Sequence, residues 1–328
     1  MLDLAAALAH LGPMASAIPI LIITGQTASG KERLAVAVAA SLGGEIVSAD
    51  SMKVYRSMDI GTAKASADER RAVPHHLLGV ADPQETFSTA LWLRLADAAI
   101  ADIHARGRVP IVSGGTPLYL KALLEGLFEG PAATPAVRER LVAEAEVQGT
   151  PALHARLAEV DAAAAARIHP NDLRRIVRAL EVWELTGSPI SDLQKQWGRR
   201  RPRYRPLVAA IRRDREDLTR RIRERVRRMA DAGLVEEVRR LAARPGGLAR
   251  GPRQALGYAE VLDYLDGRMA WEETVAAIVA HTRQFARRQM TWLSRFEGVA
   301  WLDAAPDTPV ETLADQVVEL WGKHGSNM

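Results

Sequence analysis

The chain has 328 residues, 48% of them hydrophobic and 26% charged, a composition that fits a folded protein with a full core and excludes a disordered or fibrous chain. It contains no cysteine, so disulfides and thiolate-bound metals are excluded. Residues 1–164 carry 14 Lys and Arg against 18 Asp and Glu, whereas residues 165–328 carry 30 against 22, so a polyanion should bind the second half.

The opening residues 1–17 are apolar and alanine-rich, and we expect them to form a flexible lead. No Lys or Arg occurs before Lys31, so this stretch lacks the positive start of a signal peptide. Gly12 and Pro13 interrupt it before it is long enough to span a membrane. Met14 is an alternative start. We therefore expect a cytoplasmic protein with no membrane contact.

The next stretch predicts a phosphate-binding loop. The apolar run 20–23 suits a strand buried on both faces of a parallel sheet, and an alanine-rich helical pattern follows. Between them the spacing GxxxxGK is complete, in the strand, loop and helix context that a P-loop requires, and such loops cradle phosphate oxygens with backbone N–H groups. The loop consists of Gly25, Gln26, Thr27, Ala28, Ser29, Gly30 and Lys31, followed by Glu32 where Ser or Thr is usual.

Two further predicted strands end in polar residues. The strand at 45–49 ends at Asp50, and the strand at 109–112 is followed by Ser-Gly-Gly and Thr116. Taken alone, each would be read as a turn or helix cap. Because the carboxyl ends of parallel strands meet at one edge of a sheet, we expect Lys31, Asp50 and Thr116 to converge on one site.

The rest of the chain is mostly helical in pattern. Helices are predicted at 90–106, 135–147, 151–157, 173–185, 215–232, 253–264 and 271–292, with one returning strand at 207–211. We therefore expect an α/β fold with a P-loop NTPase-like parallel sheet core, an all-helical insertion and a helical C-terminal part. The expected domains are the core at 18–119, the insertion at 120–200, and the return to the core with the C-terminal helices at 201–328.

The predicted helix 215–232 is strongly basic. Arg221 and Arg225 flank its apolar stripe one turn apart, where they can neutralise a pyrophosphate, while the other Arg residues fill the outer face. A genome rich in Arg codons explains why the chain has 38 Arg and only 6 Lys, but it does not explain their clustering. The cluster comprises Arg199, Arg200, Arg201, Arg203 and Arg205, followed by nine Arg from Arg212 to Arg228.

Taken together, ten ordered segments resemble the bacterial tRNA dimethylallyltransferases. They are GQTASGK at 25, SADS at 48, DIGTAK at 59, PHHLLGVADP at 74, VSGGTPLYLKALLEG at 112, ARIHPND at 166, RRIVRALEVWELTG at 174, RRIRERV at 220, RQALGY at 253 and TRQFARRQMTWL at 282. No single segment is specific, but ten in order over nearly the whole chain are.

The resemblance implies transfer of the dimethylallyl group from dimethylallyl diphosphate to N6 of adenosine 37, beside the anticodon in the anticodon stem-loop of tRNA, with release of diphosphate. The loop like Gly25–Lys31, with Glu32, would hold the diphosphate. The residue like Asp50 would accept the N6 proton, and the one like Thr116 would help to hold the leaving group. Arg221 and Arg225 complete the expected catalytic set, Mg²⁺ is the expected cofactor, and the enzyme is expected to be a monomer.

The family pattern also implies that the insertion at 120–200 binds tRNA, and it implies which residues contact tRNA. They are Asp50, Ser51, Met52, Lys53, Thr116, Arg138, Arg174, Arg175, Ile176, Val177, Arg178, Arg253, Gln254, Gly257, Tyr258, Arg287, Arg288 and Gln289. Contacts of these Arg residues with phosphates should give an affinity that falls as salt is added.

Three residues depart from the family pattern. Gln26 replaces the usual Pro and Lys53 stands where Gln is common. Glu32 replaces a hydroxyl that would meet Mg²⁺, so its carboxylate could ligate the ion or point away, and we expect activity with an altered Mg²⁺ dependence. Two other functions remain open: a small-molecule kinase in which Asp50 activates a hydroxyl, and a non-catalytic tRNA-binding protein on a degenerate P-loop.

Overall fold

A computed structural model describes residues 17–127, 130–131, 134–195 and 204–326. Residues 1–16 of the expected lead at 1–17, and the Arg residues at 199–203, lie outside the described residues. The described residues fall into two compact units, one formed by 17–124 and 204–326 and the other by 125–195. Among the described residues, no helix is long and apolar enough to cross a membrane.

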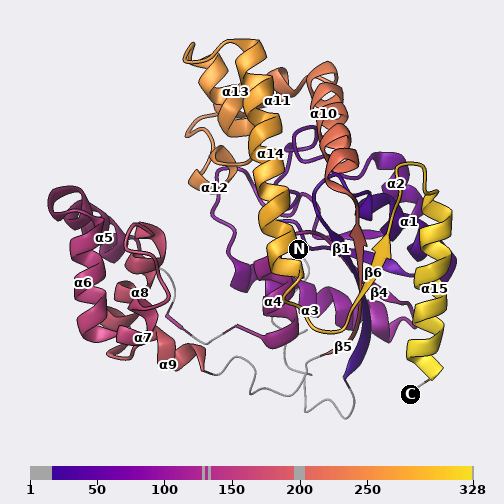
Figure 1. Cartoon of the computed structure of the whole chain (residues 1–328), viewed down its shortest axis with the longest axis horizontal. Coiled ribbons are helices and arrows are strands. Elements are labelled where there is room, and N and C mark those ends of the chain that lie inside the picture. Colours follow the sequence, from indigo (N-terminus) through magenta and orange to yellow (C-terminus); the bar gives the residue numbers. More distant parts are fainter. Residues whose placement is uncertain (1–16, 128–129, 132–133, 196–203, 327–328) are drawn as a thin grey trace. The chain divides into compact units, whose positions relative to one another are not determined.

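The first unit is built on a parallel sheet in the order β3-β2-β4-β1-β5-β6 (Figure 1). The central strand β1 pairs with β4 at Leu21 and Ile111, and with β5 at Leu21 and Leu207. The P-loop-like α/β core expected from the sequence is confirmed. The strands are β1 (Ile18–Gly25), β2 (Glu45–Ser48), β3 (His75–His76), β4 (Pro110–Ser113), β5 (Tyr204–Arg212) and β6 (Val299–Asp303).

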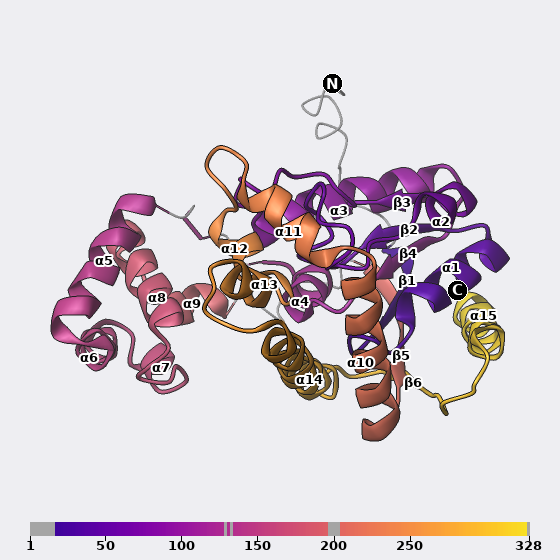
Figure 2. The same cartoon turned by 90° about the horizontal axis from the view of Figure 1, so that it is seen from above.

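Helices cover both faces of this sheet (Figure 2). The chain moves outward from β1 through β2 to the edge strand β3 and then back inward to β4. Right-handed crossovers in opposite directions place α1, which follows β1, and α3, which follows β3, on opposite faces. On the α1 side, Leu34 and Val38 pack with Leu313 and Val317 of α15 over Leu21. The helices of this unit are α1 (Lys31–Leu42), α2 (Ala67–Ala72), α3 (Thr89–Ala105), α4 (Pro117–Glu125), α10 (Arg215–Asp231), α11 (Leu234–Ala242), α12 (Arg250–Arg253), α13 (Tyr258–Leu265), α14 (Trp271–Leu293) and α15 (Val310–Ser326).

The second unit is entirely helical over its described residues. Its core is formed by apolar side chains that recur at helical spacing, among them Leu141, Leu157, Ile176 and Leu180. The predicted helices at 135–147, 151–157 and 173–185 are present with ends shifted by a few residues. The helices are α5 (Pro135–Gln148), α6 (Thr150–Val160), α7 (Ala162–Ala165), α8 (Leu173–Thr186) and α9 (Ile190–Gln194).

Candidate active site

The candidate site lies where the direction of the sheet reverses. Strands β1 and β4 are neighbours, but the chain leaves β1 toward β2 on one side and leaves β4 toward β5 on the other. In open α/β sheets, ligands bind outside the carboxyl ends of strands at such a switch point. The glycine loop follows β1 and the Gly-Gly-Thr turn follows β4, so both sequence motifs lie at this position.

The glycine loop has a backbone that only particular residues allow. Gly25 has φ 145°, and a Cβ there would lie 2.9 Å from Ser29 Oγ and 3.0 Å from the carbonyl oxygen of Ile211. Gly30, the N-cap of α1, has φ 100°, a left-handed conformation that glycine adopts at low cost. Lys31 is buried, and its Nζ donates to the carbonyl oxygen of Gln26 at 3.3 Å. The loop therefore wraps around its own lysine.

Two buried hydroxyls at this edge have no hydrogen-bond partner among the described residues. They are Ser29 Oγ in the loop and Ser113 Oγ at the end of β4. Buried polar atoms are almost always paired. An unpaired hydroxyl inside a glycine loop at a helix N-terminus fits the binding of a phosphate oxygen, which is the group the loop pattern predicts.

Asp50 and Thr116 are brought together by backbone contacts between the ends of β2 and β4. The N–H of Ser51 donates to Thr116 Oγ1 at 3.0 Å, and the N–H of Thr116 donates to the carbonyl oxygen of Ala49 at 3.2 Å. Asp50 Oδ1 accepts from the N–H of Met52 at 2.8 Å. The negative charge of Asp50 also acts on buried Lys31. The expected convergence of Lys31, Asp50 and Thr116 on one site agrees with this geometry.

Two glycines make this approach possible. A Cβ on Gly114 would lie 2.2 Å from the carbonyl oxygen of Ala49, and a Cβ on Gly115 would lie 3.2 Å from the carbonyl oxygen of Gly25. The side chain of Thr24 completes the junction by donating to the carbonyl oxygen of Gly114 at 2.8 Å. The β4 turn therefore packs directly on the ends of both neighbouring strands.

Helix α14 is tied to the glycine loop by two amide side chains. Gln26 Nε2 donates to the carbonyl oxygen of Ala286 at 3.0 Å, so this departure from the family pattern joins the loop to the helix. Gln289 accepts from the N–H of Thr27 and donates to the carbonyl oxygen of Gly115 at 2.6 Å. Because Gln289 is buried in this role, its side chain is not free to bind tRNA as the resemblance implied.

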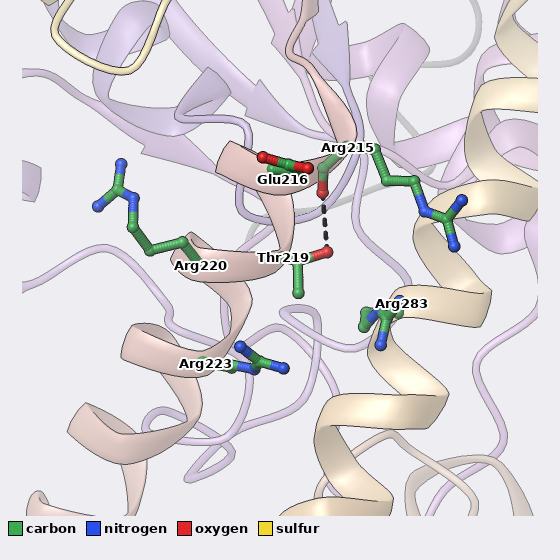
Figure 3. Close-up of a pocket in the computed structure, with 6 residues that line it drawn as sticks. All are labelled: Arg215, Glu216, Thr219, Arg220, Arg223 and Arg283. Atoms are coloured by element: carbon green, nitrogen blue, oxygen red, sulfur yellow. Dashed lines mark hydrogen bonds between the residues drawn. The ribbon is translucent and has the colours of Figure 1, made fainter.

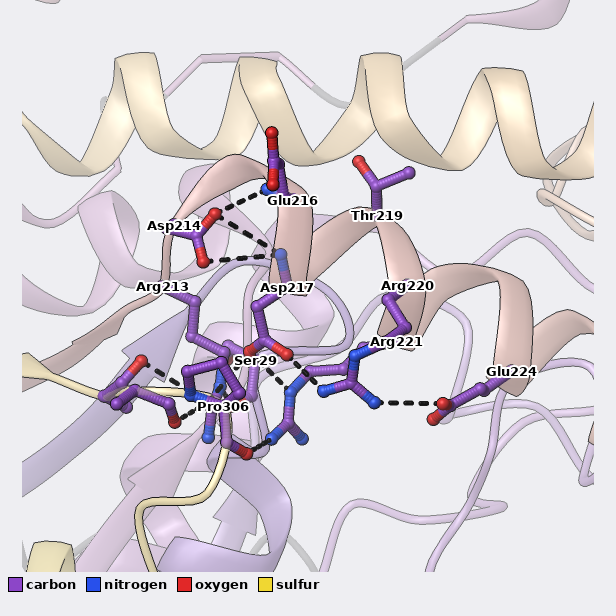
Figure 4. Close-up of polar contacts among 12 residues, drawn as sticks. Ser29, Arg213, Asp214, Glu216, Asp217, Thr219, Arg220, Arg221, Glu224 and Pro306 are labelled. Atoms are coloured by element: carbon purple, nitrogen blue, oxygen red, sulfur yellow. Dashed lines mark hydrogen bonds and ion pairs between the residues drawn. The ribbon is translucent and has the colours of Figure 1, made fainter.

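The arginine that touches the glycine loop is Arg213, which the sequence analysis does not single out. Its Nε donates to the carbonyl oxygen of Ser29 at 2.8 Å, and its Nη1 pairs with Asp217 at 3.0 Å (Figure 4). Arg213 follows the end of β5, so the rule that selected Asp50 and Thr116 could have found it.

Of the two arginines expected on the pyrophosphate, neither contacts the loop directly. Arg221 donates to Asp217 Oδ2 at 2.8 Å and to the carbonyl oxygen of Pro306 at 2.9 Å. Arg225 donates to the carbonyl oxygen of Thr62 at 3.3 Å, and its charge acts on Lys31 and Glu32. Arg225 is thus close enough to add positive potential at the phosphate loop. Arg221 is instead held by its hydrogen bond to Asp217.

A basic pocket of about 360 Å³ lies between α10 and α14. Figure 3 shows Arg223 extending from α10 toward α14, where Arg283 lies. Its other lining residues are Arg215, Glu216, Thr219 and Arg220. This concentration of Arg suits a polyanion and agrees with the basic second half of the chain.

Glu32 forms a small charge cluster with two lysines. Its Oε1 lies 3.0 Å from Nζ of Lys53 and 3.6 Å from Nζ of Lys31. Burial lowers the pKa of Lys31 below its ordinary value, and the charge of Glu32 opposes that shift. Although burial raises the pKa of Glu32, the charges of Lys31 and Lys53 lower it well below its usual range. Glu32 is therefore ionised and already neutralised by protein cations.

This cluster does not fit a resident Mg²⁺ site. Among the described residues there is no group of three or more His, Cys, Asp or Glu side chains that could hold a metal. Glu32 Oε1 already accepts a hydrogen bond from the ammonium group of Lys53 and lies beside that of Lys31. The expectation that Glu32 is a metal ligand is not supported by these contacts.

The residues expected to contact tRNA within the first unit differ in their exposure. Arg253, Gln254, Arg287 and Arg288 are exposed, and Ser51 and Met52 are half-buried. Gly257 and Tyr258 are buried, and the hydroxyl of Tyr258 donates to Glu237 at 2.5 Å. The expectation that the side chain of Tyr258 contacts tRNA is therefore corrected, because that side chain lies in the core.

In the helical unit the expected tRNA residues have two kinds of surroundings. Arg174 and Arg175 are exposed, whereas Ile176 and Val177 lie in the core, which corrects the expectation that these two apolar side chains bind tRNA.

Arg138 and Arg178 of this unit surround one buried carboxylate. Arg138 pairs with both oxygens of Glu181, at 2.9 and 3.0 Å, and Arg178 Nη1 donates to Glu181 Oε2 at 2.6 Å. A bidentate pair to a buried carboxylate holds a guanidinium in one orientation.

Comparisons with known proteins agree with this geometry. Residues 53–296 match the family model described as IPP transferase. The chain is 51% identical over 298 residues to a tRNA dimethylallyltransferase of Anaeromyxobacter dehalogenans strain 2CP-C, covering 91% of this chain and 98% of that protein.

Two solved structures are also similar. The tRNA delta(2)-isopentenylpyrophosphate transferase of Staphylococcus epidermidis is 34% identical with a TM-score of 0.68, and the match covers 93% of this chain and 99% of that one. A eukaryotic dimethylallyltransferase acting on tRNA is 27% identical with a TM-score of 0.81, and the match covers 94% and 80%.

Proposed function

The chain belongs to the tRNA dimethylallyltransferase family and is a prenyltransferase that acts on tRNA, and we propose that it transfers the dimethylallyl group of dimethylallyl diphosphate to N6 of adenosine 37, beside the anticodon. The observation that carries this proposal is the junction of three strand ends. The strand ends that carry Asp50 and Thr116 are joined by hydrogen bonds of 3.0–3.2 Å, and buried Lys31 of the phosphate-type loop lies close enough for the charge of Asp50 to act on it.

In the proposed reaction, N6 of adenine attacks C1 of the dimethylallyl group while the bond from C1 to the diphosphate oxygen breaks. The exocyclic amine is a weak nucleophile, so Asp50 accepts its proton as the new C–N bond forms. Asp50 Oδ1 accepts hydrogen bonds from the N–H groups of Met52 and Lys53, which fixes the direction of the carboxylate. Diphosphate leaves with the electron pair of the broken bond.

Negative charge that grows on the departing diphosphate meets donors that are already in place. The loop N–H groups, Lys31 and Arg225 supply positive potential in a partly buried site, where such interactions are strong. Thr116 helps to hold the leaving group. Arg221 does not contact the phosphate loop and acts indirectly, through its ion pair with Asp217. The adenine must leave its stack to reach Asp50, as for other enzymes that act on a base.

We further propose that Mg²⁺ arrives bound to the diphosphate and is not held in a protein cage. Mg²⁺ usually keeps several waters and binds substrate phosphates with one or two carboxylates at most. We also propose that the enzyme works as a monomer, in the cytoplasm where its tRNA substrate is found.

A single assay tests the proposal. The protein is incubated with labelled dimethylallyl diphosphate and with transcripts that carry or lack an adenosine at position 37, and label in acid-insoluble RNA is counted. We expect incorporation only with the adenosine-37 transcript. ATP consumption without incorporation would favour the kinase, and tRNA binding without diphosphate release would favour the non-catalytic alternative.

A further inference from the structure

Glu32 and Lys53, two of the three residues that depart from the family pattern, contact one another. Lys53 Nζ donates to Glu32 Oε1 at 3.0 Å, and Lys31 Nζ lies 3.6 Å from the same oxygen. The lysine side chains are only 6% and 4% exposed, whereas that of Glu32 is 40% exposed. One carboxylate thus serves as the counter-ion of two buried ammonium groups.

Lys53 joins this cluster to the candidate base. Its backbone N–H donates to Asp50 Oδ1 at 3.2 Å, while its side chain reaches Glu32 at the first turn of α1. The turn after β2 is therefore connected to the phosphate loop through a single residue. A carboxylate beside the loop would repel diphosphate if it were alone, and a buried ammonium without a counter-ion is costly.

We propose that Glu32 is a positioning residue that neutralises Lys53 and orients Lys31, and that the Glu32–Lys53 ion pair holds the Asp50 turn against the phosphate loop. The pair carries no net charge, so the loop keeps the charge of Lys31 for its ligand. Glu32 is then not a metal ligand. That the ligand is a diphosphate rests on the proposed function, whereas the coupling of the two side chains does not.

The test compares Glu32→Ser, Lys53→Gln and the double variant with the parent protein. Affinity for inorganic diphosphate is measured by calorimetry without tRNA or prenyl donor, with and without Mg²⁺. Lys53→Gln removes one of the two cations that neutralise Glu32, so the Glu32 carboxylate then repels the diphosphate. We expect the affinity for diphosphate to fall about tenfold. Glu32→Ser should leave the affinity for diphosphate unchanged, because the loop keeps the charge of Lys31, but kcat should fall about tenfold, since the Asp50 turn loses its anchor. The double variant should bind within about threefold of the parent, because neutral residues then replace a neutral pair.

The matched control removes the exposed pair of Glu319 and Lys323 on α15, by Glu319→Gln and Lys323→Gln, and should leave diphosphate affinity unchanged. The inference is overturned if the effects of the two single changes on affinity simply multiply in the double variant. It is also overturned if Glu32→Ser raises the Mg²⁺ concentration needed for half-maximal diphosphate binding, as loss of a metal ligand would.

Folding is monitored by the thermal midpoint. If Glu32→Ser does not fold, the inference is tested with the double variant. Adding Lys53→Gln removes the unpaired ammonium group and should restore folding. A double variant that also fails to fold would contradict the proposed ion pair. The two proposals can fail separately. If Glu32 and Lys53 prove to be coupled but the protein transfers no label to tRNA, the proposed function is refuted and this inference still holds.

Discussion

Gln289 of α14 accepts a hydrogen bond of 2.7 Å from the backbone N–H of Thr27 in the phosphate loop. Its amide nitrogen donates to the carbonyl oxygen of Gly115 in the β4 turn. One buried side chain therefore connects the two loops that would surround the leaving group, although it lies 262 residues from Thr27 along the chain.

Gln289→Leu should destabilise the protein and weaken binding of dimethylallyl diphosphate. The change leaves a loop N–H and a turn carbonyl without partners, at about 1–3 kcal/mol for each buried group. Thermal unfolding and the KM for the diphosphate measure the two effects. Gln284→Leu, on the exposed side of the same helix, is the control. Equal midpoints for the two variants would show that the bridge does not stabilise the fold.

Asp50→Asn should lower the rate of prenyl transfer by about 100- to 10,000-fold, the range for loss of a general base. Asparagine keeps an oxygen that accepts from the N–H groups of Met52 and Lys53, so the turn should persist. Single-turnover kinetics and tRNA binding measured side by side should show lost rate with retained affinity. Asp68→Asn, on exposed α2, should change neither. Parallel loss of rate and affinity would assign Asp50 to tRNA binding alone.

Gly114→Ala should disrupt the junction between β2 and β4. The added Cβ would lie 2.2 Å from a backbone oxygen of Ala49, which cannot move without shifting the Asp50 turn. We expect a loss of about 2 kcal/mol or more in the free energy of unfolding, together with lost activity. Gly322→Ala meets no atom within 4 Å in helix α15 and should be neutral or slightly stabilising. Denaturant unfolding of both variants checks the contrast.

Arg174 and Arg175 should bind tRNA phosphates. Replacing both by Ala should weaken binding at low salt and reduce the slope of log affinity against log salt by about 1 for each lost contact. Arg140, paired with Glu144 in the same helical unit, provides the control, and Arg140→Ala should leave the slope unchanged. Filter binding between 50 and 200 mM salt, a range in which such slopes are clear, distinguishes the two results.

Glu45 should make the fold sensitive to acid. Hydrogen bonds from Arg106 lower the pKa of this buried carboxyl to about 2, against an ordinary value of 4.5, despite the opposing effect of burial. A depressed pKa gives stability that is complete above about pH 4.5 and is lost as the pH falls toward 2. Glu45→Gln should therefore cost at most about 3 kcal/mol at neutral pH and flatten the pH dependence below 4.5. Circular dichroism during acid titration measures this, with Glu319→Gln as an exposed control.

Local spacing in the sequence was enough to locate the main elements. The strand at 20–23, the GxxxxGK loop and the amphipathic helices at 135–147 and 173–185 depend on neighbours within a few residues, and each is present. Strand β6 and helix α15 were not predicted. Four of the five residues of β6 are at least partly exposed at the edge of the sheet, so the strand lacks the continuous apolar run of a central strand.

The sequence alone determined the class of fold, the phosphate loop and the convergence of three strand ends, because these follow from local patterns and from the parallel sheet they imply. Only the tertiary structure decided which side chains meet. It paired Glu32 with Lys53, put Arg213 in place of Arg221 against the loop and buried Tyr258 on Glu237. Such contacts join residues far apart in the chain, and no local pattern encodes them, since they depend on how the packed elements bring particular side chains within hydrogen-bonding distance.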